Sequence, residues 1–400
     1  MKKFYSLLIA ILMTGIPFPA AEAKPFSYPV IPGLTDECLK FYRTEALIGA
    51  IIGKMTVREK IAQLIFTDFG GWKWTELEEY LGTNPLGGMI LMGAYIKGCD
   101  YQKLKANIGK LQGLSQKIPV LICVDQEGGL VQRLKTIIGN YPSPAKTYET
   151  KGAEGIRLLA EEFAQKLSGL GIQVDFAPVV DSIYNNASVV VKRTFTKNGA
   201  TNAMLGNIFI ETFDKYGMIA AAKHYPGYGT VGVDPHYFTC KDASGKIEEV
   251  GFPFFAMTNC KMIMTSHVIF SLYDNEPATL SPAVLALLRE TFQGVIITDD
   301  LRMGSITALH GYRNAALMAL KAGCDAILLI TPGLESWKKN ADTMIDFLMT
   351  SYTNGSLSEW EIDEKVARIL RLKLASLTGW KWGVFDKTEL DEYRKLFPSE

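Results

Sequence analysis

Residues 223 to 236 hold the densest group of side chains in this sequence that could do chemistry. An apolar run ends there at Lys223 and His224, and a loop rich in glycine and proline then places Asp234 two positions before His236. An aspartate bonded to one nitrogen of an imidazole fixes its tautomer and raises the basicity of the other nitrogen. A solvated turn can carry the same Asp-x-His spacing, but the adjacent cation and imidazole favour chemistry. We therefore predict that Asp234 and His236 form an acid/base pair.

Two further carboxylates, Asp299 and Asp300, end another apolar run at residues 294 to 298. Successive residues of a strand point to opposite faces, so only one of the two can face a site at the strand end. A carboxylate fixed at such a position suits a nucleophile or a general base. We assign that role to Asp299, whereas Asp300 could cap a helix that begins near Ser305.

A third polar cluster follows the apolar run at residues 120 to 124. Asp125 and Glu127 flank Gln126 ahead of two glycines, and Arg133 follows. Carboxylate, amide and guanidinium groups around a tight turn can bind sugar hydroxyls. The alternative is a strand-to-helix turn that carries a surface salt bridge.

Eight short apolar runs, alternating with longer amphipathic segments, must position these clusters. The runs are nearly continuous rather than alternating, as expected of strands buried on both faces. Helix start signals are present as well, among them Thr56 with Glu59, and Ser281 followed by Pro282. The runs cover residues 64–67, 88–92, 120–125, 174–178, 219–224, 262–267, 295–299 and 326–330.

This pattern predicts a single α/β domain, a (β/α)8 TIM-type barrel with N- and C-terminal helical extensions. A doubly wound open sheet is the main alternative, but no GxGxxG or Walker-type loop follows any run. Active sites of such barrels lie at the C-terminal ends of the strands. Ionisable side chains gather at those ends, where a purely structural protein would have to pair or hydrate each of them. They are Asp125, Asp181, His224, His267 and Asp299.

Composition excludes several classes of protein. The 400 residues include 42 basic and 42 acidic side chains, so no overall charge would attract nucleic acid or an anionic membrane. The six cysteines show neither CxxC nor histidine-paired spacing, so we expect no metal and no cofactor. We also expect a monomer.

The N-terminus has the layout of a secretory signal peptide. Positive charge precedes an apolar run over residues 4 to 18, and Ala21-Glu22-Ala23 offers small residues for cleavage. An uncleaved anchor is the alternative, although the run is shorter than the roughly 20 residues that span a bilayer. We predict that residues 1–23 are removed, that residues 24–400 form the mature barrel domain, and that the protein is periplasmic or extracellular.

Four motifs, in a shared order and spacing, resemble glycoside hydrolase family 3 and, more narrowly, its bacterial β-N-acetylglucosaminidase branch. The likeness runs from about Thr56 to Arg371, which is most of the chain. The motifs are Lys223-His224-Tyr225-Pro226-Gly227-Tyr228-Gly229, Asp234-Pro235-His236, Asp125-Gln126-Glu127-Gly128-Gly129 and Thr298-Asp299-Asp300-Leu301.

The resemblance implies a retaining exo-β-N-acetylglucosaminidase acting on peptidoglycan fragments or chitin-like oligosaccharides. Asp299 would attack the anomeric carbon and form a covalent glycosyl-enzyme. His236, oriented by Asp234, would protonate the leaving oxygen and later deprotonate water, in place of the usual second carboxylate. The positions that match the family's N-acetylglucosamine-binding residues are Asp125, Arg133, Arg193, Lys223 and His224.

Three positions depart from the family pattern. Pro235 stands where serine is usual between the two dyad residues, and it removes one amide donor from the loop. Tyr228 and Leu130 stand where the family often has histidine or arginine. The alternatives to the main reading are a β-glucosidase or other exo-glycosidase of the family, phosphorolysis in place of hydrolysis, and a non-catalytic carbohydrate- or cell-wall-binding barrel.

Overall fold

The computed structural model describes residues 36–68, 74–115, 117–331 and 337–376. Eight parallel strands close into one barrel, so the prediction of a TIM-type barrel is confirmed and the open sheet is wrong. The strands are β1 (Ile65–Asp68), β2 (Gly88–Ile90), β3 (Leu121–Val124), β6 (Val174–Asp175), β7 (Ile219–Tyr225), β9 (Met262–Thr265), β11 (Val295–Asp300) and β12 (Ala326–Leu329). Their order around the barrel is β1-β12-β11-β9-β7-β6-β3-β2. The predicted signal peptide, residues 1–23, lies outside the described residues.

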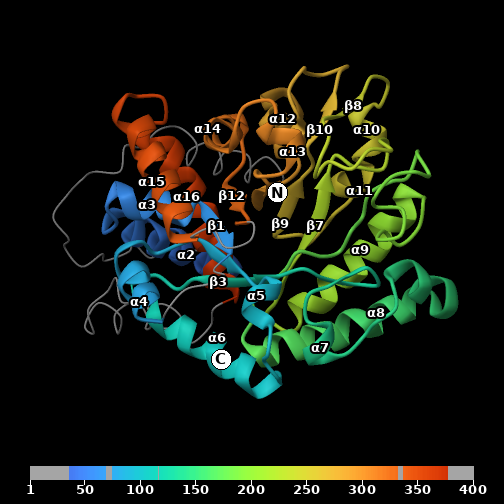
Figure 1. Ribbon diagram of the computed structural model, residues 1–400, viewed down its shortest axis with the longest axis horizontal. Coiled ribbons are helices and arrows are strands. Elements are labelled where there is room, and N and C mark those ends of the chain that lie inside the picture. The colour runs from blue at the N-terminus through green and yellow to red at the C-terminus, as the bar shows by residue number, and fades with distance from the viewer. Residues whose placement is uncertain (1–35, 69–73, 116, 332–336, 377–400) are drawn as a thin grey trace.

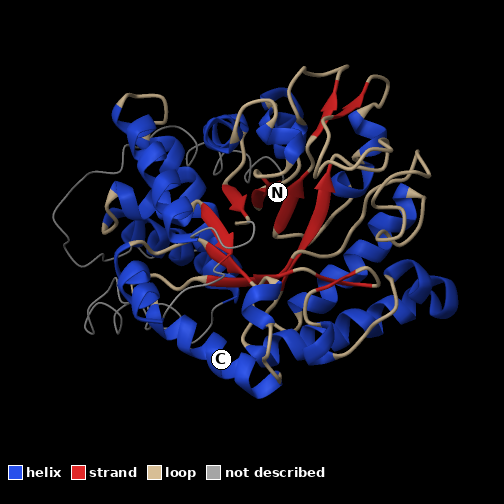
Figure 2. Ribbon diagram, in the orientation of Figure 1, coloured by secondary structure: helices blue, strands red, loops and turns tan. Residues whose placement is uncertain are grey.

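Helices surround the strands on the outside of the barrel (Figures 1 and 2). The predicted capping box of Thr56 with Glu59 is present, and the Ser281 side chain caps a helix that begins with Pro282. None of the described helices is both long and apolar enough to cross a bilayer. The helices are α2 (Asp36–Gly53), α3 (Val57–Gln63), α4 (Trp74–Thr83), α5 (Gly93–Ile96), α6 (Tyr101–Leu114), α7 (Lys135–Ile138), α8 (Pro144–Leu170), α9 (Gly199–Asp214), α10 (Ile247–Val250), α11 (Phe252–Phe255), η1 (Ala278–Leu280), α12 (Pro282–Arg289), α13 (Gly304–Thr307), α14 (Tyr312–Ala322), α15 (Trp337–Thr353) and α16 (Glu359–Ser376).

Two small sheets extend the C-terminal rim of the barrel, and the hydrophobic pattern did not predict them. The antiparallel pair β4 (Gln126–Gly128) and β5 (Val131–Gln132) follows β3 in the chain. The parallel pair β8 (Cys240–Asp242) and β10 (Val268–Phe270) links the loop after β7 to the segment after β9. Both pairs therefore fix loops that carry predicted site residues.

Two barrel strands change register where they reach this rim. β7 shifts against β9 between Lys223 and Tyr225, and β11 shifts against β12 between Ile297 and Asp300. A bulge of this kind turns side chains away from the regular alternation and is common beside active sites. The irregularities thus fall at His224 and Asp299, two of the residues that the sequence assigned to chemistry.

The opposite, N-terminal end of the barrel is closed by buried polar side chains. Lys373 of α16 donates to the Gln63 side chain at 2.6 Å and to the Leu86 carbonyl at 3.2 Å. Asp325, which precedes β12, is fully buried and accepts hydrogen bonds from Arg289 at 2.7 Å and Arg368 at 2.9 Å. These contacts tie helices α12 and α16 to the base of the barrel.

Candidate active site

The rim holds a buried cluster of alternating charges. The ammonium of Lys223, at the end of β7, lies 2.8 Å from Asp125 and 2.7 Å from Glu127. The guanidinium of Arg193 makes two bonds to the same Glu127 carboxylate, at 2.9 and 2.7 Å. Three of the predicted sugar-binding residues are therefore brought together, and Glu127 joins them.

Electrostatics keep this cluster charged in spite of its burial. Burial by itself raises the pKa of Glu127, but Arg193 and Lys223 outweigh that effect and lower it to about 2. Burial lowers the pKa of Lys223, yet the carboxylates of Asp125 and Glu127 more than offset it, so the value lies above that of an ordinary lysine. Glu127 and Lys223 thus present opposite fixed charges, which can orient hydroxyl groups.

Arg133 lies at the outer edge of the cluster. Its side chain is 42% exposed, and its Nε atom is 4.0 Å from the Asp125 carboxylate. Its backbone nitrogen donates to the Asp125 carbonyl at 3.2 Å, which fixes the start of the side chain. A guanidinium so placed is free to meet a ligand that rests on Asp125.

The imidazole of His224 is oriented by Asp181. One carboxylate oxygen of Asp181 accepts from the backbone nitrogen of His224 at 3.0 Å and lies 3.1 Å from its Nδ1 atom. A carboxylate at Nδ1 fixes the orientation of the ring and favours a proton on that nitrogen. Nε2 lies 3.4 Å from the Arg193 guanidinium, which joins His224 to the charged cluster.

The Asp299 carboxylate is held by two donors. Its Oδ2 atom accepts from the Tyr228 hydroxyl at 3.0 Å, and its Oδ1 atom accepts from the backbone nitrogen of Asp300 at 2.8 Å. The Tyr228 hydroxyl in turn accepts from the backbone nitrogen of His267 at 3.0 Å. Burial by itself raises the pKa of Asp299, but His267 and His224 more than compensate, so the net pKa is lowered. An ionised, oriented carboxylate is the form that a nucleophile needs.

Asp300 points away from this position and has a different environment. Its carboxylate accepts from the backbone nitrogens of Arg302 and Ile330, both at 3.0 Å. Burial raises its pKa to about 7. It does not cap α13, whose N-cap residue is Met303. The two neighbouring carboxyls are therefore differentiated, as strand alternation led us to expect.

Asp234 and His236 form the predicted pair in the loop after β7. The Asp234 carboxylate lies 2.7 Å from Nδ1 of His236 and accepts from its backbone nitrogen at 2.9 Å. These two hydrogen bonds outweigh the opposing effect of burial, so the pKa of Asp234 is lowered. The His236 side chain is 62% exposed, which leaves Nε2 accessible to a ligand.

The same loop is attached to the segment that follows Asp299. The carbonyls of Pro235 and His236 accept from the backbone nitrogens of Ser305 and Gly304, at 3.1 and 2.9 Å. Pro235 therefore supplies an acceptor to this junction, and the lost amide donor does not disturb the contact between Asp234 and His236. The acid/base pair and the candidate nucleophile thus sit on segments that are directly bonded.

Four further residues complete the site, although the sequence did not assign them to it. Glu127 belongs to the polar cluster after residue 124 and Asp181 to the ionisable strand ends, and their buried partners now give them orienting functions. Tyr228 belongs to the motif at residues 223–229, where it departs from the family pattern, but sequence reasoning gave it no role. His267, fully buried, bonds through Nε2 to the Asp300 carbonyl at 3.0 Å. In the described ranges, no three potential ligands converge in a way that would hold a metal ion.

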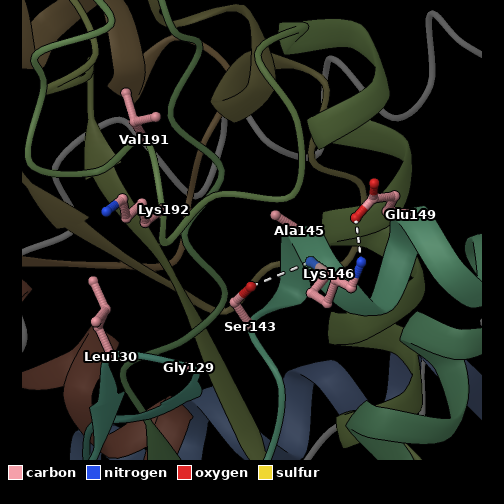
Figure 3. Close-up of a pocket in the computed structure, with 8 residues that line it drawn as sticks. All are labelled: Gly129, Leu130, Ser143, Ala145, Lys146, Glu149, Val191 and Lys192. Carbon is pink, nitrogen blue, oxygen red and sulfur yellow. Dashed lines mark hydrogen bonds and ion pairs between the residues drawn. The ribbon is translucent and has the colours of Figure 1, made fainter.

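An open hollow of about 550 Å³ lies beside the charged cluster (Figure 3). It is bounded by the turn of the β4–β5 pair, the first turns of α8 and the loop that precedes Arg193. Lys146 and Glu149 on α8 bind each other at 2.9 Å across one wall. The hollow is lined by none of the predicted catalytic or sugar-binding residues, so we place the site at the rim and not in this hollow.

Comparisons with known proteins identify the family of this chain. The model of the glycosyl hydrolase family 3 N-terminal domain matches residues 56–372. A β-hexosaminidase of Bordetella pertussis is 30% identical over 322 residues, covering 76% of this chain and 87% of that protein. The β-hexosaminidase LpqI of Mycobacterium tuberculosis is 28% identical over 369 residues, covering 88% of this chain and 89% of that one.

A solved structure shares the architecture as well. It is a glycoside hydrolase family 3 β-N-acetylglucosaminidase from Paenibacillus sp. str. FPU-7, with a TM-score of 0.74 and 26% identity. The match covers 86% of this chain and 68% of that one. The family model spans all eight barrel strands and includes every predicted site residue. The chain therefore belongs to glycosyl hydrolase family 3.

Proposed function

We propose that this protein is a retaining exo-β-N-acetylglucosaminidase that hydrolyses O-glycosidic bonds. The observation that carries the proposal is the convergence, at one rim, of an oriented Asp299 carboxylate with an Asp234–His236 pair. Membership of the family supports it, as do similar proteins named β-hexosaminidase and β-N-acetylglucosaminidase.

The first chemical step is attack by Asp299 on the anomeric carbon. The Tyr228 hydroxyl and the Asp300 amide hold the carboxylate, and the lowered pKa keeps it ionised. His236 protonates the leaving oxygen from Nε2 while Asp234 holds Nδ1. In the second step, the same nitrogen takes a proton from water as the glycosyl-enzyme is hydrolysed, so one residue serves as acid and then as base.

The remaining rim residues hold the sugar. Asp125, Lys223 and Arg193 offer carboxylate and cationic groups whose mutual bonds fix their positions. Such preorganised polar groups orient hydroxyls at small cost, because they do not reorganise on binding. His224, held by Asp181, presents its Nε2 atom to the sugar, and Arg133 closes the outer edge.

The decisive experiment uses chromogenic β-N-acetylglucosaminide and β-glucoside with the wild type, Asp299→Ala and His236→Ala. We expect preference for the N-acetylated substrate and loss of turnover in Asp299→Ala, restored in part by azide with formation of an α-configured product. Turnover of neither substrate by the wild type would exclude the enzyme, and preference for the glucoside would exclude the N-acetyl specificity. A rate that requires added phosphate would show phosphorolysis instead.

The proposal extends to the natural substrate and its location. The signal-peptide layout of residues 1–23 supports export, so the substrate would be peptidoglycan fragments or chitin-like oligosaccharides outside the inner membrane. N-terminal sequencing of the protein recovered from the periplasm or medium should begin at Lys24. Release of N-acetylglucosamine from purified muropeptides, compared with chitooligosaccharides at equal concentration, identifies the preferred substrate.

A further inference from the structure

Two consecutive aromatic side chains project into solvent directly after the proposed acid/base. Tyr237 is 75% exposed and Phe238 is 61% exposed, and Val233, just before Asp234, is 43% exposed. Because these apolar side chains remain in water, they contribute little to the stability of the fold. An exposed apolar patch beside a polar site is typical of a ligand-binding surface.

The backbone beneath these rings is well anchored. The amides of Tyr237 and Phe238 both donate to the Asp234 carbonyl, at 3.1 and 3.0 Å. Gly304 at the start of α13 lies so close that an added Cβ atom would come within 2.7 Å of the His236 carbonyl oxygen and 3.1 Å of the Tyr237 Cα. The turn is therefore held against α13 while both rings stay free to contact a ligand.

The chemistry of the proposed reaction places the leaving group at this surface. A general acid must lie within hydrogen-bonding reach of the oxygen that it protonates. That oxygen belongs to the leaving group, so the first unit of the leaving group has to sit beside the His236 ring. The Tyr237 ring centroid lies 6.3 Å from that of His236, and the Phe238 centroid lies 6.4 Å from that of Tyr237. The two rings thus border the position where a departing sugar must stand.

We propose that Tyr237 and Phe238 form an aglycone platform, which binds a pyranose leaving group by stacking against its apolar face. The inference rests on the proposed function and adds the residues that bind the leaving-group sugar. Aromatic side chains suit this task because they offer a large, rigid apolar surface with few rotatable bonds. Because the platform and His236 share one turn, sugar binding also holds the acid against its oxygen.

The test compares two N-acetylglucosaminides that both have poor leaving groups and both need the acid. One is the methyl β-glycoside, which has no ring in the leaving group, and the other is the β-1,4-linked disaccharide. We expect Tyr237→Ala to lower kcat/KM for the disaccharide by roughly fivefold to tenfold and to leave the methyl glycoside within about twofold. Phe238→Ala should act in the same direction, and Tyr237→Trp should retain the preference for the disaccharide.

Trp360→Ala is the matched control, because Trp360 is 68% exposed and lies on α16, away from the rim. It should change neither rate. An equal loss of both substrates in Tyr237→Ala would mean that Tyr237 acts through His236, and no loss of either would mean that the rings bind nothing in the leaving group. Either result overturns the platform. Failure of the wild type on both glycosides would instead overturn the proposed function.

Discussion

The two ends of the barrel differ in how completely their buried polar groups are hydrogen-bonded. At the N-terminal end, the Asp325 carboxylate accepts hydrogen bonds from Arg289, Arg368 and the backbone nitrogen of Ile296. At the C-terminal rim, Lys223 and Arg193 are also paired with carboxylates, but the surroundings are left incompletely bonded. Within the described residues, several buried polar atoms without a partner lie around the rim: Gln126 Nε2, Asp175 Oδ2, Ser182 Oγ, Thr230 Oγ1, Ser266 Oγ and His267 Nδ1.

This difference separates polar groups that stabilise the fold from those available to a ligand. A buried polar group without a partner destabilises the folded state, so a fold retains such groups where something else compensates. Water and sugar hydroxyls can provide that compensation at the open rim. At the base, the protein's own side chains already do so. Substitutions at the two ends should therefore have opposite effects on activity and stability.

The largest expected effect is at the rim, on activity alone. Asp299→Asn keeps the shape of the side chain but removes the nucleophilic charge, so we expect kcat/KM to fall by about 10⁴-fold or more. The free energy of unfolding should change by no more than about 1 kcal/mol, because the side-chain oxygen of asparagine can still accept from the Asp300 amide and the Tyr228 hydroxyl can accept from the new NH2 group. Steady-state kinetics and urea unfolding of the same preparation measure the two quantities. A large loss of stability would mean that Asp299 stabilises the fold, as the polar groups at the base do.

The converse is expected at the base. Asp325→Ala leaves the guanidinium groups of Arg289 and Arg368 without their shared carboxylate, and breaking a buried pair in this way costs about 3–5 kcal/mol of stability. The folded fraction should retain kcat/KM within about twofold, since no rim residue touches Asp325. Urea unfolding and an assay at low temperature test both statements. If activity fell in proportion to stability, the two ends would not be independent.

The sequence was sufficient to predict one of these ends in outline. All eight barrel strands follow from near-continuous apolar runs, because strands buried on both faces leave that pattern in the chain. Lys223, His224 and Asp299 were predicted as site residues because each sits at the point where such a run ends, and the structure places them at one rim. Asp234 and His236 were found because they are two residues apart. Both kinds of pattern involve residues close together in the chain, so they can be recognised in a single sequence.

The rest of the site depends on contacts across the fold. Glu127 meets Arg193 across 66 residues, and Tyr228 meets Asp299 across 71. Neither pair can be read from spacing, since the closed barrel alone brings the strands together. The base shows the same limit, because Lys373 reaches Gln63 across 310 residues. The short sheets β4–β5 and β8–β10 were missed because their polar segments lack a strand pattern.

A smaller effect should come from Tyr228→Phe, which removes the hydroxyl that donates to Asp299. A hydrogen bond to the charged form favours ionisation, so its loss should raise the pKa of Asp299. We expect kcat to fall by about tenfold at neutral pH with little change in KM. The acid limb of the kcat/KM profile should move to higher pH, because the nucleophile then ionises later.

Tyr225→Phe is the matched control for this change. Tyr225, the last residue of β7, is as buried as Tyr228, but its hydroxyl donates to the Val284 carbonyl, away from the rim. It should leave the acid limb in place. A Tyr228→Phe enzyme whose profile also stayed in place would show that the hydroxyl fills space without influencing the carboxylate.

The smallest effect concerns pH and the base of the barrel. Burial lowers the pKa of Lys373 well below that of an ordinary lysine. The unfolded chain therefore binds this proton more readily, and the stability contributed by Lys373 must increase with pH between its folded pKa and about 10.4. Relative to Lys373→Met, the wild type should gain up to about 1.4 kcal/mol per pH unit in that window. Urea unfolding from pH 7 to 10 gives this difference, and the exposed Lys146→Met should show none of it. A pH-independent difference would mean that the Lys373 amine stays protonated in the fold, and the base of the barrel would then hold an unpaired charge where the rim holds only paired ones.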